Sequence, residues 1–208
     1  YKKNMLWLHY MKPTSAETRR NTAKELWDTL KFIILAAAIV IPIRMFVFQP
    51  FIVSGESMYP TFHNADYLII DEFGYYFKEP KRGDVIVFHY PKDPKRYFIK
   101  RIIGLPGETV IFKDRGVYIK NSENPDGVKL SEPYLSQITI PGEQQEVTVT
   151  PDNYFVMGDN RGFSSDSRTW GLLPKENITG RPGLRLLPLN DISYKPGSLE
   201  KFTDTTTQ

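Results

Sequence analysis

The chain has 208 residues, of which 40% are hydrophobic and 13% aromatic, a globular composition rather than a disordered one. It carries 27 Lys+Arg against 24 Asp+Glu, so its formal net charge is +3. Cysteine is absent, which excludes disulfides, thiolate metal sites and cysteine-based catalysis.

The basic residues are concentrated near the N-terminus. Residues 1–50 contain 8 Lys+Arg and 3 Asp+Glu, a charge of +5, whereas residues 51–208 contain 19 and 21, a charge of −2. A nucleic-acid-binding protein usually carries its basic face on the folded domain. We therefore expect no nucleic acid among the partners.

The apolar stretch LKFIILAAAIVIPIRMFVFQPFIV, residues 30–53, predicts one transmembrane helix over residues 29–49, because about 20 apolar residues span a bilayer. Pro42 and Arg44 weaken this pattern, and a buried core helix or a cleaved signal peptide are the alternatives. Basic residues precede the uncharged stretch of the span, residues 32–43, at Arg19, Arg20, Lys24 and Lys31. By the positive-inside tendency, residues 1–28 are cytoplasmic and the body of the protein lies across the membrane.

The rest of the chain predicts short strands separated by turns. Apolar or alternating runs occupy residues 66–73, 83–90, 96–112 (with a turn at 104–107), 116–121, 143–150 and 153–160. Most of the 16 prolines and 14 glycines fall between these runs. The pattern predicts a mainly β, antiparallel fold. We expect a core in two parts, residues 50–104 and 151–195, a small accessory β subdomain at 105–150, and a flexible tail at 196–208.

Ser57, in the stretch SGESMYPTF, is the first candidate for chemistry. A serine nucleophile needs a base, and the three histidines are His9, His63 and His89. A lysine can replace histidine if burial lowers its pKa, since the amine must be neutral to accept a proton. Lys100 lies inside the apolar stretch YFIKRIIGLPGE, where such burial is expected. The polar loop MGDNRGFSSDSRTWG, residues 157–171, is a third candidate site segment, or a solvated loop.

Taken together and in this order, the apolar helix, SGESMYPTF, RGDVIVFHYP, YFIKRIIGLPGE and GDNRGFSSDSRTWG resemble the bacterial type I signal peptidases (signal peptidase I), which are membrane-anchored Ser-Lys leader peptidases. The resemblance covers about residues 30–185. It implies a β-sheet catalytic domain on the outer face of the bacterial cytoplasmic membrane. Its function would be serine endopeptidase cleavage of signal peptides, without metal or cofactor.

The resemblance also implies roles for single residues. Ser57 would be the nucleophile and Lys100 the general base, while Ser164 would hold the lysine nitrogen. Asp159, Asp166 and Arg168 would support the site through ion pairs and hydrogen bonds. The oxyanion would bind the Ser57 N–H and a second donor, for which Gly55 is the candidate. Some members have serine at that position, so the second donor stays open between the Gly55 N–H, a water and Ser54.

The partners implied are preproteins bearing signal peptides, with small residues at the first and third positions before the cut, and membrane lipid. The substrate would add as a β-strand. The expected pocket walls are Phe51, Val53, Met58, Phe62, Phe98 and Ile99. The aromatic candidates for a lipid-facing surface are Phe46, Phe48, Phe51, Tyr75, Tyr76 and Phe77. The alternatives are another membrane-anchored Ser-Lys processing peptidase, a self-cleaving repressor-type protein, and an inactive peptide-binding relative. The oligomeric state is not indicated.

Overall fold

The computed structural model describes residues 15–46, 48–135 and 145–199, and the chain divides into two compact units, residues 1–44 and 45–208. The first unit consists mainly of helix α1, Ser15–Phe46. Large apolar side chains of this helix are exposed, among them Trp27, Phe32, Leu35 and Val40. By hydropathy, no helix among the described residues is long and apolar enough to cross a membrane. The anchor at residues 29–49 therefore stays a prediction, and its side chains from 41 to 49 lie outside the described part.

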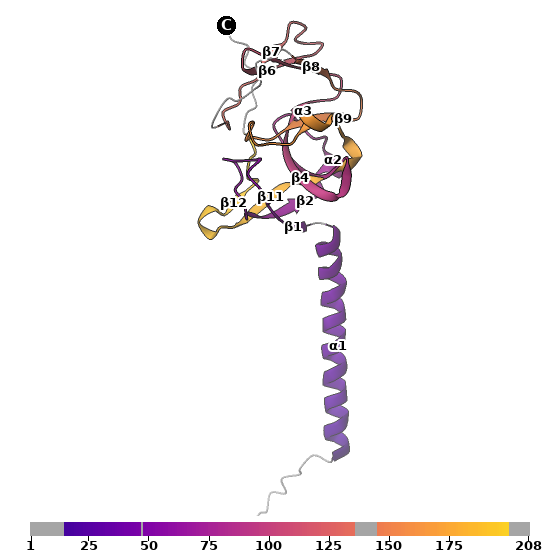
Figure 1. Cartoon of the computed structure of the whole chain (residues 1–208). Helices are drawn as coiled ribbons and strands as arrows, with labels where there is room; N and C mark the ends of the chain where they lie inside the picture. The colour runs from indigo at the N-terminus through magenta and orange to yellow at the C-terminus, as the bar shows by residue number, and fades with distance from the viewer. Residues whose placement is uncertain (1–14, 47, 136–144, 200–208) are drawn as a thin grey trace, which may run out of the picture. The chain divides into compact units, whose positions relative to one another are not determined.

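The second unit is built from two antiparallel sheets (Figure 1). The larger sheet has the order β1-β2-β11-β3-β4-β9-β10, and β12 pairs with β11. Its strands are β1 Phe48–Ile52, β2 Tyr67–Asp71, β3 Val85–Tyr90, β4 Asp93–Gly104, β9 Asn153–Met157, β10 Leu173–Pro174, β11 Ile178–Leu187 and β12 Ser193–Tyr194. All of these pairings are antiparallel, so the predicted mainly β, antiparallel fold is confirmed.

The smaller sheet has the order β7-β6-β5-β8. Its strands are β5 Thr109–Lys113, β6 Gly116–Lys120, β7 Val128–Lys129 and β8 Gln145–Thr148. In Figure 1, β6, β7 and β8 lie at the opposite end of this unit from β1, β2 and β11. One apolar cluster joins the two sheets, because Val110 and Val117 pack with Ile103 and Phe155 of the larger sheet.

Helices in the second unit are short wherever the structure describes it. They are α2 Gly74–Phe77, α3 Ser167–Trp170 and the 3₁₀ turns η1 Lys175–Asn177 and η2 Leu189–Asp191. Asp166 is the N-cap of helix α3, and its carboxylate accepts the Arg168 N–H.

Strand β4 decides where the site lies. Its side chains are exposed from Pro94 to Tyr97 and fully buried from Lys100 to Gly104. The change occurs because β4 enters the middle of the sheet, between β3 on one edge and β9 on the other. Phe98 packs against one apolar cluster and Ile99 against another, so β4 is packed on both faces next to the buried Lys100.

Strand β11 is the largest element that the sequence pattern does not predict. It contains Gly180, Pro182 and Gly183, which read as turn residues. In the sheet, Pro182 lies opposite Ile70 of β2 at a register shift, a bulge where the missing N–H of proline is tolerated. A Cβ at Gly180 would overlap the backbone carbonyl of Asp71, so this glycine permits close strand approach.

The predicted tail at 196–208 begins too early. Pro196 is buried, and the carbonyl of Gly197 accepts a 2.8 Å hydrogen bond from Nη1 of Arg101. Residues 196 and 197 therefore belong to the packed unit, because Pro196 is buried and the Gly197 carbonyl, like that of Gly83, accepts a hydrogen bond from the buried Arg101.

Candidate functional site

Ser57 lies in the loop between β1 and β2. The base of this loop is closed by two backbone hydrogen bonds, from Val53 N–H to Asp66 and from Ala65 N–H to Val53. Met58 and Phe62 anchor the loop in the core, with exposures of 1% and 0%. The apolar anchors on the C-terminal side leave the Ser57 side chain half-buried, at the edge of a groove.

Lys100 reaches this serine from β4. Its Nζ lies 2.7 Å from the Ser57 Oγ and 2.8 Å from the carbonyl oxygen of Ile99. The lysine is only 4% exposed. Burial lowers the pKa of Lys100 to about 8, although the charges of Asp166 and Asp159 act in the opposite direction. The two residues that the sequence analysis pairs are therefore in hydrogen-bond contact, and the amine is poised for proton transfer near neutral pH.

Asp159 forms an ion pair with Arg101, the residue that follows Lys100 in β4. Both are buried, and the guanidinium holds the carboxylate through two hydrogen bonds, Nε at 2.8 Å and Nη2 at 2.6 Å. The Thr61 hydroxyl also donates to this carboxylate. The ion pair links β4 to the start of the loop after β9. Because each buried charge has its partner, neither Asp159 nor Arg101 is an isolated charge in the core.

Asp166 and Arg168 form a second pair across the same loop. Nε and Nη2 of Arg168 donate to the two carboxylate oxygens of Asp166, each at 2.8 Å. Asp166 also accepts the Gly158 N–H at 3.0 Å. Burial by itself would raise the pKa of Asp166, but the hydrogen bonds and charge of Arg168 hold that pKa below its ordinary value. The pair fixes the loop in a closed turn beside Lys100.

No hydrogen bond joins the Ser164 hydroxyl to the lysine nitrogen, which is the contact that the family resemblance implies. This hydroxyl is buried and has no hydrogen-bond partner among the described residues. A Cβ at Gly158 would overlap both the Ser164 side chain and the Ser57 carbonyl oxygen. Ser164 is therefore packed against the nucleophile loop, and its role toward Lys100 stays a prediction.

The two candidate oxyanion donors differ in availability. The Ser57 N–H has no hydrogen-bond partner among the described residues. The Gly55 N–H, by contrast, donates to Oδ1 of Asn64 at 2.9 Å. Gly55 also has φ +95°, a conformation that glycine adopts without strain. Gly55 thus shapes the loop, and its amide is not free to be the second donor in this conformation.

A groove of about 490 Å³ opens beside the dyad. Four of the six predicted pocket residues line it: Phe51, Val53, Phe98 and Ile99. Met58 and Phe62 do not line it. They pack in the core under the nucleophile loop, because the turn at 58–62 points their side chains inward. The remaining lining side chains are Ile52, Ser54, Leu68, Val87, Arg96, Tyr97 and Ser165, besides Ser57 and Lys100.

The histidines within the described residues make their contacts with other groups than the serine. His63 is exposed and stacks edge-on with Tyr59. His89 bonds the carbonyl of Pro94 through Nδ1 at 2.7 Å. His9 lies outside the described residues. Neither described histidine has a hydrogen bond to Ser57, which leaves the lysine as the base in reach.

The described aromatic side chains among those expected to contact lipid, Phe51, Tyr75 and Phe77, do not share one site. Phe51 lines the groove and packs edge-on against Tyr97, with ring centroids 4.9 Å apart. Tyr75 donates to Asp84 and lines a different cavity. Phe77 is 73% exposed. The side chains of Phe46, Phe48 and Tyr76 lie outside the described part.

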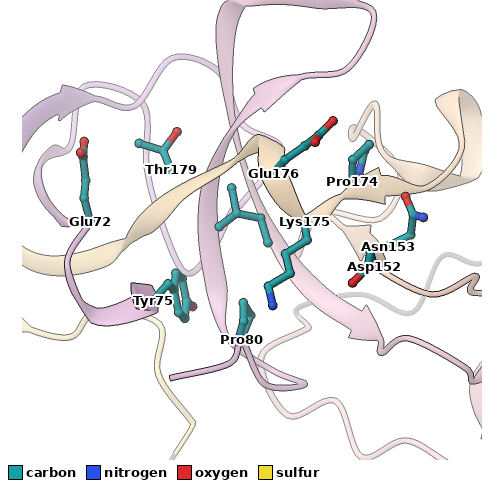
Figure 2. A pocket seen from close by; sticks show the side chains of 10 residues that line it. Glu72, Tyr75, Pro80, Asp152, Asn153, Pro174, Lys175, Glu176 and Thr179 are labelled. Atoms are coloured by element: carbon teal, nitrogen blue, oxygen red, sulfur yellow. The ribbon is translucent and has the colours of Figure 1, made fainter. Parts of the chain in front are cut away.

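A second cavity has a larger volume, about 740 Å³, and Figure 2 shows the side chains that line it. Its lining residues are Glu72, Tyr75, Pro80, Asp152, Asn153, Pro174, Lys175, Glu176, Ile178 and Thr179. Lys175 is paired with Glu79 at 2.7 Å. No residue of the Ser57–Lys100 groove lines it. Among the described residues, no group of three or more His, Asp or Glu is placed to hold a metal ion.

Several site residues were not singled out from the sequence. Asn160 crosses to the nucleophile loop, donating its N–H to the Ser57 carbonyl and its Nδ2 to the Glu56 carbonyl, both at 3.0 Å. Arg161 is buried and paired with Glu132. The family motif GDNR contains Asn160 and Arg161, but the partner Glu132 is far away in the sequence and carries no local signal.

Comparison with known proteins identifies the family. The family model described as "Signal peptidase, peptidase S26" matches residues 26–187. A "Signal peptidase I" of Bacillus amyloliquefaciens is 36% identical over 191 residues, which is 87% of this chain and 95% of that protein. "Signal peptidase I T" of Bacillus subtilis (strain 168) is 37% identical over 188 residues, 86% of this chain and 92% of the relative.

Among solved structures, a signal peptidase I from Enterococcus faecalis V583 is similar, with 35% sequence identity and a TM-score of 0.43. The match covers 50% of this chain and 97% of that one. The family model spans more than half of this chain, and curated relatives exceed 30% identity over most of its length. The chain therefore belongs to the signal peptidases of the peptidase S26 family.

Proposed function

We propose that Ser57 and Lys100 form the catalytic dyad with which this signal peptidase, a serine endopeptidase, removes signal peptides from preproteins. The observation that carries the proposal is the 2.7 Å contact between the Lys100 Nζ and the Ser57 Oγ, at the edge of a groove and with the amine buried. Buried lysines with a lowered pKa are suited to act as a general base at neutral pH.

The reaction proceeds by acyl transfer. The neutral amine of Lys100 takes the Ser57 proton as Oγ attacks the carbonyl carbon of the scissile peptide bond. The resulting oxyanion is stabilised by the Ser57 N–H, which has no other partner within the described residues. The protonated Lys100 then gives its proton to the leaving amine. Water, deprotonated by the same amine, hydrolyses the ester and regenerates the serine.

The substrate binds in the groove as an added strand. Its two walls come from the segment 51–54 and from strand β4, so an extended peptide lies between two backbones that have hydrogen-bonding groups to offer. Phe51, Val53, Phe98 and Ile99 give the floor an apolar character suited to small side chains next to the cut. Ser164, Asp159, Asp166 and Arg168 hold the loop against which the dyad is packed.

The chain acts while anchored in the bacterial cytoplasmic membrane through residues 29–49, with the catalytic unit on the outer face. Two features support this. Exposed apolar side chains follow one another from Leu30 to Val40 of α1, and the basic residues precede them. The membrane lipid would then be in contact with the apolar stretch of this helix.

The test is cleavage of a preprotein by the detergent-solubilised full chain, with mass analysis of the products. Ser57→Ala and Lys100→Arg should both abolish the cut, the latter because a guanidinium stays protonated. Ser122→Ala, at an exposed position of the small sheet region, is the matched control and should cleave normally. Undiminished cleavage by Ser57→Ala would remove this serine from the reaction. Turnover by Lys100→Arg would require another base.

A further inference from the structure

Arg96 is a cation on the wall of the substrate groove. It lines the groove together with Phe98 and Lys100, which are the next residues on the same face of β4. Its guanidinium lies 5.3 Å from the centroid of the Phe98 ring, and the Nζ of Lys100 lies 5.3 Å from the same centroid. The Phe98 ring therefore contacts both the catalytic amine and a permanent positive charge further along the groove.

This charge has no ion-pair partner in the part of the chain that the structure describes. Among the described residues, no carboxylate forms an ion pair with Arg96, and its side chain is exposed. The other arginines near the site differ, because Arg101 is paired with Asp159, and Arg168 with Asp166. A guanidinium that lies over an aromatic ring and has no ion-pair partner still has its planar N–H donors to offer, and such donors favour a carboxylate.

The position of Arg96 relative to the cut follows from strand geometry. It precedes Lys100 by four residues, and each residue advances a strand by about 3.3 Å. The pairing of β4 with β3 is regular from Arg101 to Tyr97 and shifts register before Tyr97, so Arg96 lies just past the regular part of the strand. A substrate strand running along β4 advances at the same rate. The substrate residue opposite Arg96 is then about four positions from the scissile bond, beyond the small residues held next to the dyad.

We propose that Arg96 selects substrates by charge, favouring an acidic residue at the fourth or fifth position before the cut and disfavouring a basic residue there. The inference rests on the proposed function, because it requires the residues before the cut to occupy this groove. It assigns Arg96 to specificity and gives it no part in the chemistry.

The experiment measures kcat/KM of the detergent-solubilised full chain on three peptide series. Each series carries Glu, Gln or Lys at one of the fourth, fifth or sixth positions before the cut. At low salt we expect the Glu peptide to be cleaved about two to five times faster than Gln, and Lys slower by a similar factor, as for an exposed ion pair. The preference should weaken as NaCl is raised, because the pair is exposed.

Charge reversal distinguishes a direct contact from a general field. In Arg96→Gln the Glu-to-Lys ratio should fall close to one, and in Arg96→Glu it should invert. Lys95→Gln is the matched control. Lys95 is the neighbouring residue, its side chain is exposed and does not line the groove, and the substitution likewise removes one positive charge. Its Glu-to-Lys ratio should stay that of the wild type.

Two outcomes would overturn the inference. If the wild type cleaves Glu, Gln and Lys peptides equally at all three positions, the groove does not read charge. If Lys95→Gln changes the ratio as much as Arg96→Gln, the effect is a diffuse field and not a contact. In both outcomes the wild type still cleaves the peptides and Ser57→Ala does not. If instead the proposed dyad is wrong, Ser57→Ala cleaves every peptide as well as the wild type does.

Discussion

Replacing Lys100 by methionine should stabilise the fold while abolishing activity. The buried amine has its pKa lowered from 10.5 to about 8, mainly by desolvation. Lys100 therefore binds its proton more tightly in the unfolded chain than in the folded one. Protonation of this amine consequently favours unfolding. At about 1.4 kcal/mol for each tenfold change, the cost of the charged form to the folded state at pH 7 is about 3 kcal/mol. Methionine fills a similar volume and carries no charge to bury.

The sign of this effect sets its pH dependence. The folded pKa is the lower of the two, so the cost is fully present below about pH 8 and disappears as the pH rises through 10.5. Lys100→Met also loses the two hydrogen bonds of the amine and gains the packing of the methionine methyl group. Both change the free energy of unfolding by an amount that does not depend on this titration. The informative quantity is therefore the change, with pH, in the stability difference between Lys100→Met and the wild type.

The assay is urea unfolding of the full chain in mild detergent at pH 7 and at pH 10.5. The advantage of Lys100→Met over the wild type should shrink by about 3 kcal/mol between the two. Ser57→Ala is the control, because it is inactive but keeps the buried amine. It should follow the wild type at both pH values. A stability difference that is the same at pH 7 and pH 10.5 would refute the reasoning, because it would mean that the amine is solvated in the folded protein.

Three further predictions concern the geometry around the dyad. On a peptide without ionisable side chains, kcat/KM should rise about tenfold per pH unit up to about pH 8 and then level off, because the neutral form of Lys100 is the base; a flat profile from pH 6 to 9 would contradict this. Gly158→Ala should lower kcat strongly, since its Cβ would displace the Ser57 carbonyl, whereas Gly162→Ala, with open space around it in the same loop, should be active; equal kcat values would argue against the close approach. Asn160→Ala should lower kcat about fivefold through loss of one hydrogen bond to the Glu56 carbonyl, with circular dichroism as the check on folding; unchanged kcat would leave Asn160 without a positioning role.

Local patterns predicted most strands of the second unit. The runs around Val85–Tyr90, Thr109–Lys113 and Asn153–Met157 are apolar, bounded by turn residues, and form β3, β5 and β9. Strand β11 was missed because its Pro182 and two glycines are turn residues by local chemistry. It becomes a strand because β2 and β3 provide partners on both edges and a bulge accommodates the proline. Pairing across the sheet is not visible in a local window.

The same distinction applies to the site. The apolar neighbours of Lys100 indicated burial, and the structure places that amine against Ser57. Met58 and Phe62 are as apolar as Phe51 and Val53, so composition could not separate core anchors from groove walls. The involvement of Asn64 was equally hidden, because an asparagine in a turn gives no sign that it occupies the Gly55 amide.

By itself, the sequence determined the class of fold, the family and the pair of residues that would meet, because residue type, burial pattern and motif order are properties of the chain. Tertiary structure alone decided which donors remain free, which apolar side chains face the groove, and which cations keep a partner. Those properties depend on atoms brought together from residues that are more than a hundred positions apart, such as Arg185 and the carbonyl of Thr61 or Asn160 and the carbonyl of Glu56. Hydrogen-bond and ion-pair energies fall off within a few ångströms, so only the folded arrangement can set them.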